Sequence, residues 1–587
     1  MATTASVAAI LSAKAQGDGA QYTALLRQLS AAEPAAAVQI LQVLAECASC
    51  VQPEVHTRLV EVVLRLRWRE DQTLAEATLG FVQELTSATP GFLRPCVDAL
   101  VRSFLPEERR EPVRRSARDH AIAMGSGAAA AASAPALPPA WLAPRVHRAL
   151  QGILQACPLA TTQLFACLKE HFPHRRRDLL CHREYLTHTL HAACYANAVL
   201  PRLMQMLVER FVELDVELTL QQRELEEEDA EDDDIFEVDV TVTSSAEAEK
   251  MRENANKLDA MLLLMFEFIE RGCRSEARDA AGVSRPTEAA QQLFESLLAA
   301  FEASLLHTYK CKCTQFLLFY CCSFHAEFAR AFVHVLLAQV RSEQLHTEAR
   351  IASAAYLASF VARARYLPLE AVQEAVGQLV GWASEYQHVQ LARMAGGPAV
   401  LDVQLHGVFY SAVQGLLYVL CFKQTQLGTP EAAGFRAALT PQLQALLDGA
   451  LNPLKFCQEN VVAEFEKLRL CECAHIIAAN ERTAVGSHSV GGGANRLDDF
   501  FPFDPLLLKQ ASERVQPLYK TWEPLPDDHL GPRASNCSSD AATSLSHSFQ
   551  NMSVTPDDLD AMMRQRLREH QQQSMLAGNP HVQAHAY

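Results

Sequence analysis

The sequence is poor in aromatic residues and lacks the short motifs that hold nucleotides or build common catalytic centres. Aromatic side chains make up 7% of its 587 residues, and a chain with few aromatics and many Ala and Leu residues favours helices over sheets. It contains no G-x-x-x-x-G-K-[ST], no G-x-G-x-x-G after a strand and no G-x-S-x-G. The carboxylates of 224–239 form a continuous run rather than an acid/base pair. We therefore expect a protein that is not an enzyme and carries no cofactor.

The sequence also lacks a secretory leader and a long hydrophobic run. Residues 1–16 have no basic start and no long apolar stretch. The 17 cysteines are therefore expected to stay reduced, in the nucleus or cytosol. The best candidates for a membrane span, Leu258–Ile269 and Val408–Phe422, fall short of the roughly 18 residues that a crossing helix needs. We expect no membrane contact.

Cysteine and histidine groups lack the spacing of a metal site. Cys47 and Cys50 form a C-x-x-C pair, but no second pair of ligands follows nearby. His188, His191 and Cys194 share a helical face by steps of three, without an accompanying carboxylate motif. C-x-C spacing on a helix points the two thiols in different directions. Two further groups have this spacing: Cys311, Cys313, Cys321 and Cys322 form one, and Cys471, Cys473 and His475 form the other. We expect buried packing and no metal, and keep an enzyme using the face of His188, His191 and Cys194 as a third hypothesis.

The net charge of −17 is unevenly distributed. Residues 224–239 contain eleven acidic residues and no Lys or Arg, which leaves about −6 on the rest of the chain. A chain with this balance is not expected to bind nucleic acid through its whole surface. Arginine clusters at 109–118 and 175–177 have no interleaved aromatic residues. We therefore expect no strong direct contact with nucleic acid.

Hydrophobic periodicity predicts an all-α protein. Helical spacing recurs along most of the chain, for example in Leu93, Cys96, Val97, Leu100, Val101 and Phe104. Fifteen or more predicted helices with mostly short connections fit stacked antiparallel pairs better than a compact bundle. A weak period of roughly 35–45 residues lies in the range of HEAT repeats. The sequence therefore predicts a HEAT-like α-solenoid with a disordered acidic insert and a disordered tail.

Composition changes set the predicted boundaries. Low complexity, charge runs and Gly, Ser and Pro clusters mark segments that cannot bury a core. The predicted parts are a disordered N-terminus (1–20), N-terminal HEAT-like helices (21–222) with a flexible Arg- and Ala-rich loop (106–144), an acidic disordered insert (223–250), C-terminal HEAT-like helices (251–482), a Gly/Ser loop (483–496), a C-terminal segment containing FFPFDP (497–530), and a mostly disordered tail (531–587) with a short helix at 556–572.

Several stretches, in the same order, resemble the RNA polymerase I-specific transcription initiation factor family. The run from Val408 to Phe422 reads as a buried helix, and Gly407 just before it allows a close turn. The stretches that carry the resemblance are FLRPC (92–96), HRAL (147–150), ARARYLP (362–368), LHGVFYSAVQ (405–414), LNPLK (451–455) and FFPFDP (500–505). Spread over about 55–525, they are jointly specific, whereas each one alone is weak.

The resemblance implies a nuclear and nucleolar HEAT-repeat protein without enzymatic activity, with some cytoplasmic presence. It implies binding to RNA polymerase I through the stalk and adjacent subunits of the enzyme, and bridging to promoter-bound core (selectivity) factors at ribosomal RNA genes. It also implies control by phosphorylation. Two departures from animal relatives are an Arg- and Ala-rich 107–140 region and a shortened N-terminal extension.

Two aromatic stretches are the predicted partner-binding sites. Pro502 and Pro505 hold FFPFDP extended, and each buried Phe contributes roughly 2 kcal/mol. The candidate partner-binding residues are His406, Phe409, Tyr410, Phe500, Phe501, Phe503 and Asp504. Equally, FFPFDP could clamp onto its own solenoid as a cap, and His406 with the aromatics could brace a helix pair.

A second hypothesis from a different class also fits the sequence. A HEAT-like chain of this length could be a general adaptor or a nuclear transport receptor. Capture of polymerase I subunits from nuclear extract distinguishes the two, because a transport receptor would instead retain Ran or cargo.

Overall fold

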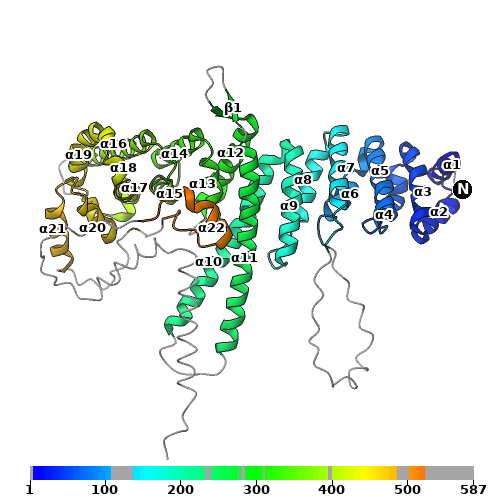
Figure 1. Cartoon of the computed structure of the whole chain (residues 1–587), viewed down its shortest axis with the longest axis horizontal. Coiled ribbons are helices and arrows are strands. Elements are labelled where there is room, and N and C mark those ends of the chain that lie inside the picture. The colour runs from blue at the N-terminus through cyan, green and yellow to red at the C-terminus, as the bar shows by residue number, and fades with distance from the viewer. Residues whose placement is uncertain are drawn as a thin grey trace, which may run out of the picture. The chain divides into compact units, whose positions relative to one another are not determined.

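The computed structural model describes residues 4–106, 137–231, 240–274, 276–278, 284–308, 311–393, 399–485, 497 and 501–522. Within these ranges helices dominate, and the only strands are the two of a short hairpin (Figure 1). The prediction of an all-α, solenoid-like fold is confirmed. The chain divides into two compact units, residues 1–206 and 207–587, and the division falls inside a helix rather than at the acidic insert.

Unit 1 (residues 1–206) is built from short helices with Pro or Asp at several of their starts. Pro34 and Pro53 occupy the first helical turn of α3 and α4, where a missing N–H costs little. Asp71 caps α5 by accepting from the Leu74 N–H at 2.8 Å. Its elements are α1 (Thr4–Ala15), α2 (Ala20–Ala31), α3 (Pro34–Glu46), η1 (Ala48–Cys50), α4 (Pro53–Leu64), α5 (Gln72–Ala88), η2 (Pro90–Phe92), α6 (Leu93–Arg102), α7 (Leu142–Ala156), α8 (Ala160–Glu170), α9 (Leu179–Tyr195), η3 (Asn197–Val199) and the start of α10 (Leu200–Glu231).

Helices of unit 1 pack on the next helix but one, as expected of a solenoid. The α5 helix contacts both α3 and α7, whereas α2 contacts α4 and α6 contacts α8. Two layers of alternating helices result. The apolar stripe predicted for α6 is buried throughout, from Leu93 to Val101.

Two predicted boundaries in unit 1 are corrected. The N-terminus was expected to be disordered to residue 20, but α1 forms there and buries Val7 and Leu11 completely. The two side chains are four residues apart and therefore share one helical face. The Leu11 carbonyl also lies 3.1 Å from Nε2 of buried His56. The loop predicted at 106–144 ends earlier, because α7 begins at Leu142; residues 107–136 lie outside the described residues.

Unit 2 (residues 207–587) contains the remaining elements. Several neighbouring helices pack in pairs, such as α14 with α15 and α16 with α17. Its elements are α11 (Val240–Cys273), β1 (Glu276–Arg278), β2 (Ser284–Pro286), α12 (Glu288–Ala303), η4 (Leu305–His307), α13 (Phe316–Cys322), α14 (Ala326–Arg341), α15 (Thr347–Arg363), α16 (Leu369–Arg393), α17 (Val403–Phe422), α18 (Gln424–Leu427), η5 (Pro430–Ala432), α19 (Ala433–Leu447), η6 (Pro453–Lys455), α20 (Glu459–Lys467), α21 (Ala474–Val485), α22 (Lys509–Val515) and η7 (Gln516–Leu518).

Helix α17 lies at the centre of this unit. Every residue from His406 to Phe422 is buried, with α15, α16 and α20 around it, so the predicted buried helix is confirmed. Its backbone departs from helical geometry at His406 (φ −113°, ψ 17°). Among the described residues, α17 is the one helix long and apolar enough to cross a membrane, and it is longer than expected. Because 94% of its most apolar stretch is buried inside the fold, α17 fits a core helix equally well.

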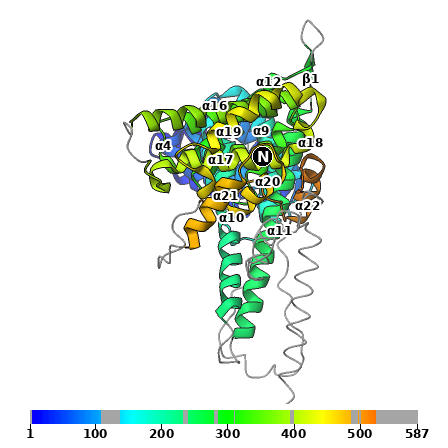
Figure 2. The ribbon, with the colours of Figure 1, turned by 90° about the vertical axis from the view of Figure 1, so that its left-hand side faces the viewer.

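The acidic insert is narrower than predicted. Helix α10 continues to Glu231 and α11 begins at Val240, so only 232–239 of the expected 223–250 segment lie outside the described residues. The two helices run side by side in both views (Figures 1 and 2). Asn254 donates to the Gln221 side-chain oxygen at 3.3 Å between them. The described contact between the two helices lies beside this part of the acidic sequence, at Gln221 and Asn254.

The hairpin and the C-terminal part complete the fold. Strands β1 and β2 pair antiparallel, with Ala277 opposite Arg285, a sheet that hydrophobic alternation does not predict. Helix α21 reaches Val485, two residues past the predicted start of the Gly/Ser loop. Residues 486–496, 498–500 and 523–587 lie outside the described residues, so neither the rest of that loop nor the predicted 531–587 tail is described.

Candidate interaction surfaces

The predicted partner-binding residues of α17 lie in the interior. His406, Phe409 and Tyr410 are all fully buried. The Tyr386 hydroxyl lies 3.0 Å from His406 Nδ1, and the Tyr386 ring stacks on Phe409 with 5.4 Å between centroids. Burial lowers the pKa of His406. His406 and Phe409 therefore brace α17 against α16, and a partner cannot reach these buried rings in this fold.

Tyr410 also joins two of the stretches that carry the family resemblance. Its hydroxyl donates to the Leu451 carbonyl at 3.1 Å, and its ring stacks on Phe456 at 4.4 Å. Asn452 next to Leu451 adopts a left-handed backbone (φ 42°), which Asn tolerates better than most residues. The bracing alternative for LHGVFY agrees with these contacts.

The described part of FFPFDP belongs to a C-terminal strap, residues 501–522, that crosses the helices of unit 2. Phe501 stacks on Tyr418 of α17 with centroids 4.0 Å apart and an interplanar angle of 11°. Phe503 is fully buried against rings from α13 and α15. These rings are Phe316, Phe319, Tyr356 and Phe360, with centroid distances of 5.5, 5.3, 5.9 and 5.9 Å. Phe500 lies outside the described residues.

Backbone groups of the strap are also paired with the solenoid. The Phe503 N–H donates to Ser359 Oγ at 2.9 Å. The Lys520 N–H donates to the Arg363 carbonyl at 2.7 Å, in an isolated antiparallel bridge. Asp259 of α11 accepts from the first N–H groups of α22, at 2.9 Å from Gln510 and 2.8 Å from Ala511. The expectation that the segment clamps onto its own solenoid agrees with this geometry.

A group of buried cations lies where the strap ends. Arg363 is fully buried under the Phe422 ring, 4.4 Å from its centroid, and its Nη2 lies 3.5 Å from Asp504 Oδ1. Lys423 donates from Nζ to the Ala364 carbonyl at 2.7 Å. Burial, and then the charge of Lys520, lower the pKa of Lys423 to about 7. Asp504, with a side chain 48% exposed, is the one described candidate residue that a partner can reach.

Asp215 of α10 is a buried carboxylate that sequence reasoning missed. It is completely buried, and its oxygens accept from the turn that leads into α13. The donors are Cys311 Sγ (2.8 Å), Lys312 N (3.2 Å), Cys313 N (2.9 Å), Thr314 N (2.8 Å) and Thr314 Oγ1 (2.9 Å). The available signal was an acid between apolar positions Leu214 and Leu218 on a helix. The carboxylate therefore fixes this turn, with four of the five bonds at Oδ2 and one at Oδ1.

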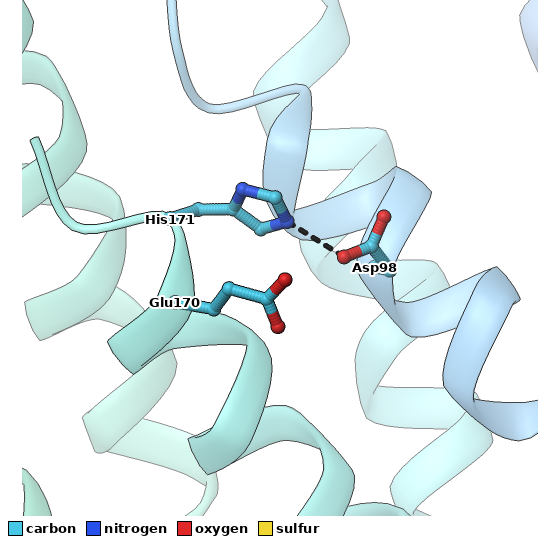
Figure 3. A group of neighbouring side chains, drawn as sticks. All are labelled: Asp98, Glu170 and His171. Carbon is cyan, nitrogen blue, oxygen red and sulfur yellow. Dashed lines mark hydrogen bonds and ion pairs between the residues drawn. The ribbon is translucent and has the colours of Figure 1, made fainter.

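Among the described residues, one group of side chains could offer three metal ligands. Asp98 of α6, Glu170 at the end of α8 and the adjacent His171 point toward one another (Figure 3), with all ligand atoms within 4.8 Å. His171 Nε2 lies 2.6 Å from Asp98 Oδ1. Arg102 pairs with Asp98 at 2.7 Å and Arg94 pairs with Glu170. Because two guanidinium groups already neutralise both carboxylates, we interpret the group as an ion-pair network between α6 and α8.

The sequence candidates for metal binding are not brought together. Among the described residues, His188, His191 and Cys194 do not converge as ligands. Instead His147 Nε2 lies 3.3 Å from His188 Nδ1, and His147 Nδ1 lies 2.9 Å from the Tyr195 hydroxyl. Burial, followed by the nearby His191 and His188, lowers the pKa of His147 to about 3. His147 is therefore a buried, packed part of unit 1 rather than a metal ligand.

The cysteine groups pack as expected. Most of the thiols in them are buried, and burial raises the pKa of Cys311, Cys313 and Cys322. Cys50 and Cys471 are partly exposed. No thiolate-rich metal group occurs in the described ranges.

The two units differ in charge. Residues 1–206 contain 21 Lys and Arg against 17 Asp and Glu, a net charge of +4. Residues 207–587 contain 31 against 52, a net charge of −21. Because electrostatic complementarity selects partners and speeds encounter, the units suit partner surfaces of opposite sign.

Comparison with known proteins gives a consistent result. Residues 2–527 match the family model described as RNA polymerase I specific transcription initiation factor RRN3. A Mus musculus protein named RNA polymerase I-specific transcription initiation factor RRN3 is 29% identical over 496 residues, covering 79% of this chain and 72% of the mouse protein. The Schizosaccharomyces pombe protein of the same description is 24% identical over 420 residues, covering 65% of this chain and 66% of its own length.

A solved structure has a similar fold. The crystal structure of RNA polymerase I transcription initiation factor Rrn3 superposes with a TM-score of 0.66 at 20% identity, covering 88% of this chain and 97% of that one. At this identity the likeness concerns the fold alone.

Proposed function

Because the chain belongs to the family of RNA polymerase I-specific transcription initiation factors, we propose that it binds RNA polymerase I and bridges the enzyme to promoter-bound core factors. The observation that carries the proposal is the match of residues 2–527 to the family, which spans both units and the strap. A protein that joins two large assemblies needs extended surfaces rather than a single cleft.

The charge difference between the units supports a bridge with two kinds of contact. Unit 1, at +4, suits an acidic partner surface, and unit 2, at −21, suits a basic one. The stalk of the polymerase and its adjacent subunits are one proposed partner surface, and the core factor is the other. Both contacts are expected to weaken as salt rises, since exposed charges are screened.

The further parts of the proposal follow from family membership. The protein acts without catalysis, in the nucleus and the nucleolus, under control by phosphorylation. Of the proposed partner-binding residues, Asp504 is accessible, whereas His406, Phe409, Tyr410, Phe501 and Phe503 are buried. We propose that these five act indirectly, by holding the outer helices of unit 2 in the shape that a partner recognises.

The test uses nuclear extract depleted of the endogenous factor. The purified full-length chain should restore transcription from a ribosomal RNA promoter, and immobilised chain should retain polymerase I subunits at low salt. RNA polymerase II and one of its promoters serve as matched controls, for which we expect neither effect.

Two results would count against the proposal. A folded chain that neither restores transcription nor retains polymerase I would remove its main claim. Retention of Ran and transport cargo, unchanged in polymerase-depleted extract, would favour the transport-receptor alternative. Bridging itself requires that immobilised core factor retain polymerase I when the chain is present and not when the chain is left out.

A further inference from the structure

Exposed apolar side chains gather where α16 ends and α17 begins. Of eight large hydrophobic side chains that are exposed in the described residues, four lie between positions 389 and 405. They are Val389 (39% exposed), Val400 (53%), Leu401 (38%) and Leu405 (58%). Exposed apolar side chains that gather in one place are typical of interaction sites, whereas singly scattered ones need no explanation.

The helix ends that carry these side chains touch. Tyr386 of α16 contacts His406 and Phe409 of α17, and Leu405 precedes His406. Trp382, Tyr386 and Val389 are spaced four and three residues apart, so they share a face of α16. Trp382 and Tyr386 are both half-buried. We call these two rings, with Val389, Val400, Leu401 and Leu405, the α16–α17 apolar surface.

The α16–α17 apolar surface has a basic rim. Arg350 and Arg393 both act electrostatically on the Tyr386 hydroxyl, which places their guanidinium groups near it. Burial nonetheless raises the pKa of Tyr386, consistent with a ring set into the base of the surface. An occupant with an apolar face and acidic side chains at one end would complement both features.

We propose that residues 555–569 of the same chain fold into a helix and cover the α16–α17 apolar surface. This segment lies outside the described residues, and its sequence carries the proposal. Thr555-Pro556-Asp557-Asp558 is a strong helix start, with a capping hydroxyl, Pro at the first position and acids in the first turn. Leu559, Met562, Met563 and Leu567 follow at helical spacing.

The chemistry of the segment fits this surface. Methionine side chains adapt to irregular apolar surfaces such as one made of Val, Leu and aromatic rings. Asp557, Asp558 and Asp560 stand together at one end of the segment, where they can meet the basic rim of Arg350 and Arg393.

The length of the intervening chain also fits. The described chain ends at Trp522, whose ring packs on Phe422 at the end of α17, 4.7 Å between centroids. The α16–α17 apolar surface lies at the other end of this 20-residue helix, about 30 Å away. A flexible chain of 32 residues, the number from 523 to 554, spans about 30 Å on average. The segment therefore reaches the surface without strain and at a useful effective concentration.

The proposal gives the tail a regulatory role that goes beyond bridging. A tail helix on this surface would keep it from an external partner until the tail is displaced. Because the contact is intramolecular, it persists at any protein concentration. Failure of this inference would leave the proposed polymerase function untouched, since the two are measured separately.

The experiment maps contacts by photo-crosslinking in the full-length chain. A photoreactive benzoylphenylalanine replaces Leu405, with the same probe at Leu159, 68% exposed in unit 1, as the matched control. We expect crosslinks from position 405 to 555–569 and none from position 159. Met563→Asp should reduce the yield at least fivefold, whereas Met575→Asp, outside the segment, should not.

The outcomes separate the possible occupants. Mixing isotopically light and heavy chains distinguishes a crosslink within one chain from a crosslink to a second copy. Hydrogen exchange of residues 555–569 should be slower in the native chain than in Met563→Asp. Crosslinks only to a second copy, crosslinks only to added nuclear proteins, or no protection of 555–569 would each overturn the proposal.

Discussion

The two units hold themselves together in different ways. In unit 1, each helix contacts helices that are close to it in the chain, so each helix depends mainly on its neighbours. In unit 2, the strap joins residues far apart, such as Asp259 with Gln510 and Arg363 with Lys520. Local packing makes stability approximately additive along the chain, whereas a strap makes distant helices depend on one another. We therefore expect damage to remain local in unit 1 and to spread in unit 2.

The largest expected effect comes from removing the aromatic anchor of the strap. Phe503→Ala leaves a cavity among four rings of α13 and α15. We expect a loss of about 3–5 kcal/mol in the free energy of unfolding of unit 2, because neighbouring rings cannot collapse fully into the gap. Hydrogen exchange should speed up along the strap and in α11, α13, α15 and α17 together.

The matched control is Phe81→Ala in α5, also fully buried. It should cost a similar free energy but speed exchange only in neighbouring helices of unit 1, such as α3 and α7. The comparison between the units fails if Phe503→Ala affects the strap alone, or if Phe81→Ala loosens all of unit 1 equally.

The second largest effect concerns the buried carboxylate of unit 2. Asp215→Asn removes the negative charge that accepts five hydrogen bonds. It also places an amide N–H₂, itself a donor, opposite some of these donors. We expect a loss of about 2–4 kcal/mol in the free energy of unfolding, since bonds to charged groups are strong and their buried donors would be left unpaired. Urea denaturation followed by exchange in α10 and α13 measures it.

Glu170→Gln in the ion-pair network of unit 1 is the contrasting change. Its side chain is 56% exposed, so the expected loss is within ~0.5 kcal/mol. Equal costs for Asp215→Asn and Glu170→Gln would show that burial of the carboxylate is not what matters.

The same contrast explains what could be predicted from sequence. Helices such as α6 and α17 were predictable because one helix carries its own periodicity, whatever it packs against. Whether Phe409 faces a partner or the core depends on Tyr386, a residue 23 positions earlier, and no local pattern reveals that pairing. The sequence therefore marks these aromatic residues as important, whereas tertiary contacts decide whether they face the core or a partner.

Charged residues were harder to interpret than apolar ones. Asp215 stands in an acidic neighbourhood of the sequence, and only the fold shows that it is buried under the turn at 311–314. The FFPFDP segment was predicted to be either a docking element or a clamp, and its strap contacts agree with a clamp. Phe500 and the tail lie outside the described residues, so for them the sequence argument stands alone.

The buried Lys423 of unit 2 predicts a pH effect above neutrality. Lys423 has a pKa of about 7 in the fold against 10.5 as its ordinary value, so between these values the unfolded chain binds more protons. Stability of unit 2 should therefore rise with pH from 7 to 10.5, and fall as pH drops through that window. Lys423→Met should flatten this slope in urea titrations, whereas Lys455→Met, at an exposed position, should leave it in place. A slope unchanged by Lys423→Met would contradict the assignment.

The histidine cluster of unit 1 predicts a pH effect on the acid side, where the two units again separate. His147 has a pKa of about 3 in the fold against 6.5 ordinarily, so the unfolded chain takes up a proton that the fold excludes. Stability of unit 1 should fall as pH drops from 6.5 toward 3.

His147→Gln keeps a partner for Tyr195 and should reduce this slope without abolishing it, because burial also lowers the pKa of His188. Hydrogen exchange measured separately in the two units at pH 4 and pH 7 tests this prediction. The control His174→Gln, at an exposed position, should resemble the native chain. An acid response confined to unit 2 would mean that the cluster is charged in the fold.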